Sequence, residues 1–403
     1  MMHFKPKFEF LTISISKLLQ RLVICSCLAL NFVVIGCQTD VSEQKRAKKG
    51  ADKNQVRYAK KFTIQHYDTY KIVSVLQATP DKNEASLHYI LYPKKGKKPV
   101  ITADSLANAL YIGTPVRNIV PLSTTHIGAL DALGLVQKIS AVTLAAHISH
   151  PKLYEQIKAG KIPELGDPEI NPEKLLSLQP DLVMSNSGSW SRQSKYRVIQ
   201  ESGIPVVANA DWLETTPLGR AEWIKFMAVF FEEDTQAQAV FDNIATSYLS
   251  LRELCKNLPQ RPRVISSSPY KDIWYVPAGG SFMATFIEDA GGVHPWKNNP
   301  GTGSLPLSFE EVYPIGLEAD FWINPGAAYS LSALTAQDTR FADFKSFKSK
   351  QVYNNHKRLN AEGGNDYWQT GFIRPDWVLA DLIFILHPEK LPQHQLIYFK
   401  PLE

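Results

Sequence analysis

The amino-acid sequence predicts an α/β protein in which two Rossmann-like lobes are joined by a single long helix, with a small β-rich N-terminal subregion ahead of them. Residues 117–213 and residues 262–403 each alternate short apolar stretches with helical patterns, which is typical of parallel sheets flanked by helices. Residues 214–261 between them show helical spacing alone. The composition, 44% apolar and 21% charged in a chain of 403 residues, is that of a globular protein with two or three domain-sized units.

The amino terminus has the order of a secretion signal. Four basic residues precede an apolar run over residues 22–35, which is shorter than the roughly 20 residues that span a bilayer. The run ends in Gly36-Cys37, which resembles the lipobox of bacterial lipoproteins, where the cysteine is lipidated and becomes the first residue. We therefore expect residues 1–36 to be a lipoprotein signal peptide and Cys37 to carry the lipid. The alternative is an ordinary signal peptide in which the cysteine is incidental.

The charge of the chain is divided unevenly. Residues 1–61 carry 12 lysines and arginines against 4 acids, a net charge of +8, whereas the remaining residues sum to −3. Residues 37–61 are polar and nearly free of large apolar side chains, so we expect a flexible tether there. The body has no positive excess of the kind that phosphate backbones require, which excludes nucleic-acid binding as its main role.

Elements of the body follow from the spacing of apolar residues. Residues 62–116 alternate apolar and polar side chains between turn-forming residues, which predicts β-strands in hairpins. In the first lobe we expect strands at residues 118–122, 138–144, 180–184 and 204–209, and helices at 127–134, 147–160 and 191–203. In the second lobe we expect strands at residues 263–268, 273–278, 321–326 and 352–355, and helices at 281–292, 308–316 and 374–388.

The segment between the lobes predicts an unusually long helix. Its apolar residues recur every three or four positions along one face: Val240, Phe241, Ile244, Tyr248, Leu251 and Leu254. A break precedes it, with Asp234 or Thr235 as the expected cap. At 1.5 Å per residue, a helix of about 24 residues is ~36 Å long. A helix of this length between two α/β halves predicts a stiff connection.

Several segments, in this order, resemble one family. Residues 172–184 (PEKLLSLQPDLVM) and 309–323 (FEEVYPIGLEADFWI) each give a helix with an acid near its start, then Pro-Asp or Ala-Asp and an apolar strand. With the long helix and the closing RPDWVLADLIFILHPE, they resemble the periplasmic substrate-binding proteins of ABC importers for iron–siderophore complexes, haem and vitamin B12. The resemblance covers residues 117–390, and residues 211–226 are similar to a subgroup from Bacteroidetes-type bacteria.

The resemblance implies a lipid-anchored, monomeric protein of the periplasm or cell envelope that holds a metal complex between its lobes and delivers it to permease subunits. In the family, one glutamate on each lobe docks onto the permease, and the matching residues are Glu173 and Glu310. An exposed acid on each lobe suits a basic partner. The alternative is that each acid only favours its helix dipole, and Glu311 competes with Glu310 for the role.

Ligands of open α/β sheets bind beyond the carboxyl ends of the strands. The loops at these ends contain the expected ligand-binding residues: Thr125, His126, His147, Trp190, Arg192, Trp212, Tyr275, Ser281, Tyr367 and Trp368. Aromatic rings suit large chelates, and an arginine can pair with a carboxylate or hydroxamate oxygen. For any single aromatic residue the alternative is core packing. We expect a ferric siderophore as the ligand, with cobalamin or haem as alternatives.

Two further alternatives remain open. His126, His147 and His150, completed by His356 or Asp366, could bind Zn or Mn directly, and His126 or His147 could be an axial haem ligand. The chain contains no G-x-S-x-G, P-loop or H-E-x-x-H pattern, so we expect no catalytic residues and no resident cofactor. Because the two-lobed fold also occurs in metal chelatases, an enzyme of that kind is the last alternative.

Overall fold

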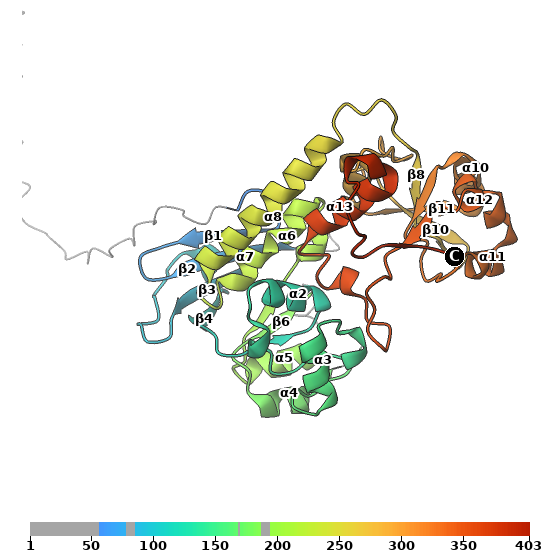
Figure 1. The fold of residues 1–403 in the computed structure, drawn as a ribbon. Helices are drawn as coiled ribbons and strands as arrows, with labels where there is room; N and C mark the ends of the chain where they lie inside the picture. The colour runs from blue at the N-terminus through green and yellow to red at the C-terminus, as the bar shows by residue number, and fades with distance from the viewer. Residues whose placement is uncertain (1–55, 78–84, 168–169, 187–193) are drawn as a thin grey trace, which may run out of the picture. The chain divides into compact units, whose positions relative to one another are not determined.

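The computed structural model describes residues 56–77, 85–167, 170–186 and 194–403, all within one compact unit, Lys48–Glu403 (Figure 1). The predicted signal peptide, the lipidation site Cys37 and most of the tether lie outside the described residues, as do Trp190 and Arg192. None of the helices in the described part of the chain is long and apolar enough to cross a bilayer.

The N-terminal subregion is a four-stranded sheet of order β1-β2-β3-β4, formed by β1 (Phe62–His66), β2 (Lys71–Gln77), β3 (Ala85–Pro93) and β4 (Leu110–Thr114). The first three strands pair antiparallel as predicted, but β4 runs parallel to β3, so this last pair is not a hairpin. The loop over residues 94–109, with the 3-10 turn η1 (Asp104–Leu106), is long enough to return the chain to the start of β4. Alternate side chains such as Val73 and Tyr89 join the main core.

The first lobe holds a parallel sheet of order β5-β6-β7, made by β5 (Val120–Pro121), β6 (Val183–Ser185) and β7 (Val206–Ala208). Its α-helices are α2 (Thr124–Ala132), α3 (Pro151–Lys158), α4 (Pro172–Leu178) and α5 (Ser194–Glu201), and its 3-10 turns are η2 (Val136–Lys138), η3 (Ala145–His147) and η5 (Asp211–Leu213).

Two expectations for this lobe are wrong. The strand predicted at residues 138–144 forms only two isolated bridges, Ile139 with Ile119 and Val142 with Glu164, because the segment meets each neighbour at a single residue. Helix α3 begins at Pro151, four residues later than expected, where proline fixes the first helical φ and His150 accepts a hydrogen bond from the Leu153 amide.

Connecting helices α6 (Pro217–Ala221) and α7 (Trp223–Ala228) precede the long helix α8 (Asp234–Leu254). Helix α8 has 21 residues, about 32 Å at 1.5 Å per residue, rather than the expected 24. The predicted cap is also wrong, because Glu233 holds the N-cap position without a side-chain bond and the Asp234 carboxylate instead pairs with Lys71 at 2.6 Å. Phe241, Ile244 and Tyr248 are buried as the spacing predicts.

The second lobe has two sheets. Parallel strands β8 (Val264–Ser266), β12 (Phe321–Ile323) and β13 (Val352–Asn354) form one of them, with β14 (Lys400–Pro401) added antiparallel at the β13 edge. The other is antiparallel, of order β11-β10-β9, from β9 (Pro269–Tyr270), β10 (Ile273–Pro277) and β11 (Ser304–Ser308). The sequence predicts the strand at β10 but not its partner β11.

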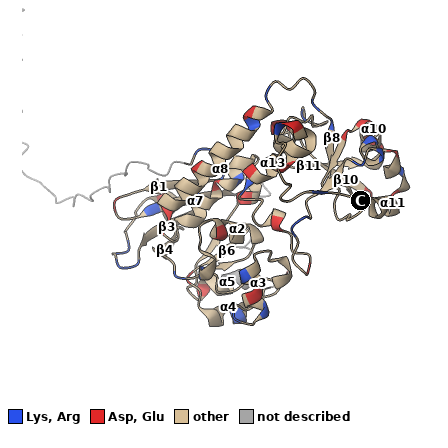
Figure 2. Cartoon of the chain, viewed as in Figure 1, with Lys and Arg blue, Asp and Glu red and all other residues tan. Residues whose placement is uncertain are grey.

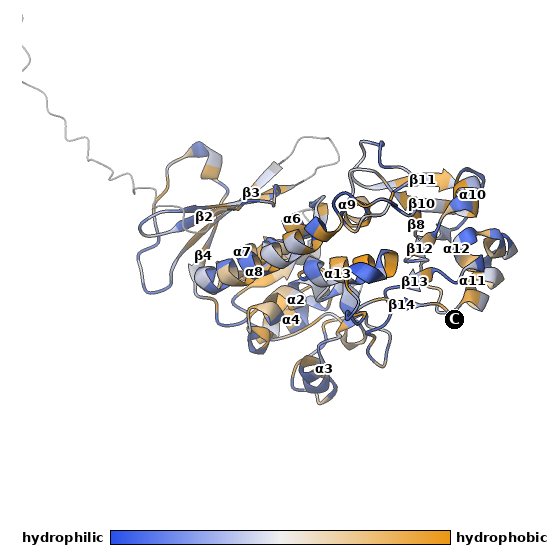
Figure 3. Cartoon of the chain, turned by 45° about the horizontal axis from the view of Figure 1, so that its top comes forward, coloured by the Kyte–Doolittle hydropathy of each residue, from blue (hydrophilic) through white to orange (hydrophobic). Residues whose placement is uncertain are grey.

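Helices of the second lobe are α9 (Phe282–Asp289), α10 (Phe309–Glu318), α11 (Leu331–Gln337), α12 (Lys345–Lys348) and α13 (Pro375–Leu386), with 3-10 turns η6 (Thr339–Asp343), η7 (Asp366–Trp368) and η8 (Pro388–Lys390). Helix α13 packs against α8, and its apolar residues extend the main core into this half of the chain (Figure 3). A separate core of the second lobe centres on closely packed rings such as Trp274, Trp322 and Phe344. The predicted α/β class, the two lobes and the single long helix are confirmed.

Candidate functional site

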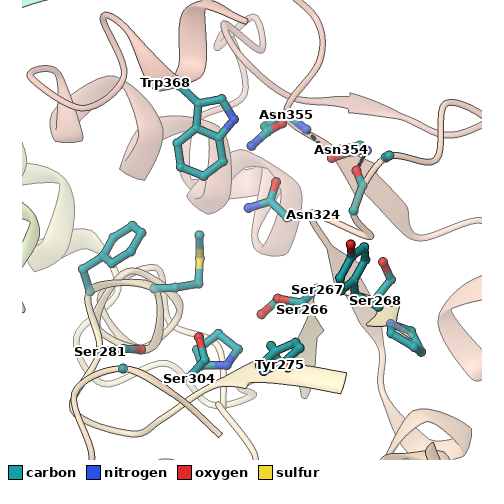
Figure 4. Close-up of a pocket in the computed structure, with 18 of the residues that line it drawn as sticks. Ser266, Ser267, Ser268, Tyr275, Ser281, Ser304, Asn324, Asn354, Asn355 and Trp368 are labelled. Atoms are coloured by element: carbon teal, nitrogen blue, oxygen red, sulfur yellow. Dashed lines mark hydrogen bonds between the residues drawn. The ribbon is translucent and has the colours of Figure 1, made fainter. Parts of the chain in front are cut away.

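A cavity of about 1530 Å³ is lined by residues of the second lobe and by Trp212, Leu213, Glu214 and Arg220 from the segment that ends the first lobe and begins the connecting helices (Figure 4). Drug-sized ligand sites occupy roughly 300–1,000 Å³, so this cavity is large enough for a bulkier molecule. Its position at strand ends agrees with the general rule for open α/β sheets.

The floor of the cavity is a set of serine and asparagine residues at the carboxyl ends of three parallel strands. Ser266 ends β8, Asn324 follows β12, and Asn354 ends β13. Figure 4 shows Ser266, Ser267, Asn324 and Asn355 around the same space. Because the three strands are parallel, their carboxyl ends meet at one edge of the sheet and bring these polar side chains together.

This floor is held from below by the aromatic core. The Trp274 indole Nε1 donates to the Ser266 carbonyl at 3.1 Å, and the Trp322 indole Nε1 donates to the Ser267 carbonyl at 2.7 Å. Ser267 has a left-handed backbone with φ 66°. Asn354 donates to the carbonyls of Gly326 and Ala328 at 2.9 and 2.8 Å. The strand-end loops are therefore fixed by buried hydrogen bonds before any ligand arrives.

Some buried polar atoms of the floor are not satisfied. Within the described residues, Ser266 Oγ and both ring nitrogens of His356 are buried without a hydrogen-bond partner. The His356 ring lies 4.8 Å from the Tyr329 ring in an edge-to-face arrangement, and burial lowers the pKa of His356, with the Lys400 charge acting in the same direction. Since unpaired buried polar groups are costly, these atoms favour a ligand with hydrogen-bonding groups at this end of the cavity.

Large aromatic side chains form the walls. Trp212, Trp368, Tyr275 and Tyr329 are between 44% and 59% exposed, which is unusual for residues of this size. The Trp212 indole is oriented by donation from Nε1 to the Asn186 carbonyl at 2.7 Å. The rings therefore offer flat apolar surface to a bound molecule.

Arg220 is a half-buried cation of the cavity wall. Its Nε donates to the Glu214 carbonyl at 2.9 Å and its Nη2 donates to the Trp212 carbonyl at 3.1 Å. The guanidinium carbon lies 3.5 Å from the centre of the Phe282 ring on α9. Burial lowers the pKa of Arg220 to about 10, although nearby Asp211 opposes the shift. The group remains cationic at neutral pH.

The lining residues nevertheless carry little net charge. Three cations (Arg220, Lys271 and Arg340) stand against four carboxylates (Glu214, Asp272, Glu310 and Asp338). The Arg340 guanidinium stacks 3.7 Å from the Phe309 ring centre, donates to Asp338 at 2.6 Å and lies 3.5 Å from Glu310. The cavity is thus polar and aromatic without a positive field.

Of the expected ligand-binding residues, four line this cavity: Trp212, Tyr275, Ser281 and Trp368. Ser281 is buried and caps α9, accepting from the Ala284 amide at 3.3 Å. The other described ones lie elsewhere. Thr125 donates to buried Asp211 at 2.9 Å, and Tyr367 is packed among the rings of Trp368, Tyr398 and Phe399.

The histidines of the first lobe do not come together at the cavity. His126 is fully buried in α2, where burial lowers its pKa to about 3. His147 is half exposed beside Asp167 at 3.3 Å, and His150 is 3.4 Å from Asp131. Among the described residues, no group of three or more His, Cys, Asp or Glu side chains is arranged to hold a metal ion.

Sequence reasoning missed the serine and asparagine floor, although a signal for it was present. Ser266–Ser268, Asn354 and Asn355 end two of the predicted strands, at residues 263–268 and 352–355, so the strand-end rule applied to them as well.

The two acids expected to dock on a permease both lie in the first turn of a helix, Glu173 in α4 and Glu310 in α10, and both are exposed. Glu311 forms a capping box with Ser308, and its hydrogen bonds from Ser308 lower the pKa of Glu311. Glu311 is therefore engaged with its own helix, whereas the Glu310 carboxylate, which lies 3.5 Å from Arg340, is 75% exposed. Glu310 also lines the cavity beside Arg340.

Comparison with known proteins agrees with this geometry. The model of the family described as "Periplasmic binding protein" matches residues 119–359, more than half of the chain. An uncharacterized lipoprotein of Methanocaldococcus jannaschii is 26% identical over 370 residues, 85% of this chain and 84% of that protein. The uncharacterized ABC transporter substrate-binding lipoprotein YvrC of Bacillus subtilis is 31% identical over 114 residues, 28% of this chain and 34% of that protein.

Solved structures show the same fold. The periplasmic haem-binding protein RhuT from Roseiflexus sp. RS-1, in its apo form, superposes with a TM-score of 0.52 at 20% identity, covering 68% of this chain and 99% of that one. The resemblance noted from residues 172–184 and 309–323 is thereby confirmed at the level of the family. The chain belongs to the periplasmic binding protein family.

Proposed function

We propose that the chain is the substrate-binding component of an ABC importer and that its cavity holds a metal chelate of low net charge, in the first place an uncharged ferric siderophore of the hydroxamate type. The observation that carries the proposal is the composition of the cavity wall: serine, asparagine and aromatic side chains surround about 1530 Å³, and the charges among them nearly cancel.

The possible metal chelates differ in their net charge, and the charges that line the cavity favour some of them over others. A ferric tris-catecholate carries three negative charges and haem carries two propionates, and anions of this kind are bound by clustered arginines or lysines. Here the guanidinium of Arg340 is neutralised by Asp338 and Glu310, and Arg220 already donates to two backbone carbonyls. An uncharged ferric trishydroxamate needs hydrogen bonds and apolar contact, which the floor and the walls supply.

Cobalamin is the second candidate ligand, because the cavity offers hydrogen-bonding partners for its amide groups. Its corrin ring carries several amide groups, and amides pair well with the Ser266 hydroxyl and with the amides of Asn324 and Asn355. The exposed faces of Trp212 and Trp368 would cover the flat ring. Direct binding of Zn or Mn is less favoured, since the described residues offer no suitable ligand group.

Delivery would use the acids on the two lobes. Glu173 and Glu310 lie on helices of different lobes, and exposed carboxylates of this kind steer a protein onto a basic partner. A lipid on Cys37 would keep the body near the permease. The loaded protein would then dock and release its ligand while ATP hydrolysis in the importer drives transport.

Tryptophan fluorescence tests the ligand directly, because Trp212 and Trp368 line the cavity half exposed. We would titrate the full chain with an uncharged ferric trishydroxamate, a ferric tris-catecholate, haemin, cyanocobalamin and ferric ion alone. Saturable quenching by the trishydroxamate is expected, and it should persist in Trp377→Phe, whose ring lies outside the cavity. Quenching by cyanocobalamin instead selects the second candidate. Quenching only by the tris-catecholate, haemin or bare iron would contradict the proposal.

A further inference from the structure

The loop between β3 and β4 concentrates positive charge on the N-terminal sheet (Figure 2). Residues 94–98 read KKGKK, and all four lysines are exposed. Lys94 pairs with Asp181 at 2.6 Å, whereas Lys95, Lys97 and Lys98 form no ion pair with any carboxylate of the described chain. Three basic groups at this corner of the sheet are thus available to a partner.

Apolar and aromatic groups lie at the same corner. Val100 is 87% exposed, the highest value among the large apolar side chains of the described chain. The Lys98 ammonium lies 4.3 Å from the centre of the Tyr111 ring, and the rings of Tyr67 and Tyr70 stack at 4.6 Å. Lys71, next to Tyr70, pairs with Leu91 of β3, and Tyr111 pairs with the adjacent Ile90, so the strand register places both pairs of contacts at the same end of the sheet.

We call this cluster the lysine–tyrosine surface: Tyr67, Tyr70, residues 94–98, Val100 and Tyr111. Its chemistry is that of a membrane–water interface. Lysines near an anionic bilayer each contribute about 1 kcal/mol of attraction. Tyrosine is enriched at the headgroup level, and an exposed aliphatic side chain gains by leaving water. The rest of the body carries net negative charge, so this surface stands apart from it.

The end of the predicted tether, residues 57–61, contacts the body just before β1 of the N-terminal sheet. The backbone amides of residues 57–59 donate to buried Glu222, and those of Lys60 and Lys61 donate to buried Glu214. These residues run directly into β1, a strand of the sheet that carries the lysine–tyrosine surface. Only 18 residues separate Cys37 from Val56, a span of at most ~70 Å. An anchor at Cys37 therefore keeps the surface within reach of its membrane.

We propose that the lysine–tyrosine surface rests on the headgroups of a bilayer containing anionic lipid and orients the body on the membrane. This is a second membrane contact, separate from the predicted lipid and from the ligand cavity. Its failure would leave the proposed function untouched, because ligand binding is measured independently by fluorescence.

Photo-crosslinking of the full chain tests the contact. Val100 is replaced by p-benzoylphenylalanine, and the chain is reconstituted into vesicles of phosphatidylcholine alone or mixed with phosphatidylglycerol. We expect chain–lipid adducts on the anionic vesicles and few on the neutral ones, with the yield falling as salt is added. The same photoreactive residue at Ser177, which is exposed on α4 of the first lobe, should give few adducts on either.

Charge removal supplies the matched comparison. Lys95→Gln with Lys97→Gln should lower the adduct yield at position 100 by up to roughly 30-fold, about fivefold for each lysine. Lys152→Gln with Lys161→Gln removes the same charge from exposed positions of the first lobe and should change nothing. Circular dichroism confirms that each variant is folded. Equal yields on both kinds of vesicle, or equal effects of the two double variants, would overturn the proposal.

Discussion

The Ser149 hydroxyl donates to the buried carboxylate of Asp366 at 2.9 Å, and this bond ties the first lobe to the loop that carries Trp368. The Ser149 amide donates to Gln369 Oε1 at 3.1 Å in the same contact. Further along the loop, Asn360 donates to the carbonyls of Ala146 and Ile148 at 3.0 and 2.9 Å. The wall of the cavity is therefore positioned by a contact between the two halves of the chain.

Removing this bond should loosen the contact. Ser149→Ala leaves the Asp366 carboxylate with Thr370 and Arg358, so we expect a loss of about 1 kcal/mol in the free energy of unfolding. Ser177→Ala is the control, because its exposed hydroxyl bonds only within its own helix. The two denaturation midpoints should differ, and identical midpoints would show that the interlobe bond contributes nothing.

The exposed tryptophans should carry much of the ligand affinity. Trp212→Ala and Trp368→Ala each remove a ring from the cavity wall, and truncation of a central aromatic contact costs at least about 1.4 kcal/mol, or tenfold in Kd. Leu317→Ala removes a comparably exposed apolar side chain outside the cavity and should leave Kd unchanged. Unchanged affinity in both tryptophan variants would place the ligand elsewhere.

Some residues of the cavity could be predicted from the sequence and others could not. Trp212, Tyr275, Ser281 and Trp368 were predictable, because the ends of parallel strands meet at one edge of a sheet whatever the details of packing. His126 was not, since this third residue of α2 has its side chain in the core, and apolar spacing does not report which way a polar residue in a short helix will face.

Some elements of the fold could likewise be predicted from the sequence, whereas others could not. Apolar periodicity over 234–254 was enough to predict a long helix, whereas β11 was missed because its apolar residues alternate over only five positions and two of its neighbours are glycines. Contacts distant in sequence, such as Ser149 with Asp366, are set by tertiary packing and leave no local pattern to read.

The buried pair of Glu222 and Lys225 should be essential for stability. Glu222 accepts from the amides of residues 57–59 and from the Lys225 ammonium at 2.8 Å, and both side chains are fully buried. Glu222→Gln removes the carboxylate that lies 2.8 Å from the buried ammonium, so we expect a loss of about 3–5 kcal/mol and faster proteolysis near residue 57. Glu253→Gln breaks an exposed pair with Lys256 of the same spacing and should cost little. A similar loss in both variants would refute this assignment.

The raised pKa of Asp211 should make the free energy of unfolding decrease as the pH rises. Burial raises the pKa of Asp211 to about 6, opposed by the hydroxyl of Thr125. A folded-state pKa above the unfolded value means that the native state binds the proton more tightly, so this stability is present below pH ~4 and is lost as the pH rises through 6. The difference in unfolding free energy between the wild type and Asp211→Asn should fall by about 3 kcal/mol over that interval. A flat difference would contradict the shift.

Docking can be separated from binding. Glu173→Lys should abolish uptake of the ligand while Kd stays the same, because Glu173 is exposed on α4 and lies outside the cavity. Glu155→Lys reverses an exposed acid on α3 and serves as the control for net charge. Loss of ligand affinity in Glu173→Lys, or equal loss of uptake in both variants, would remove the docking role.

The most direct test of the account is the position of the metal. A crystal of the chain grown with an uncharged ferric trishydroxamate, measured at the iron edge, gives one anomalous peak for each bound chelate. We expect that peak inside the cavity, between the floor at Ser266 and Asn324 and the ring of Trp368. An iron peak outside the cavity, or a cavity without iron at saturating complex, would contradict it.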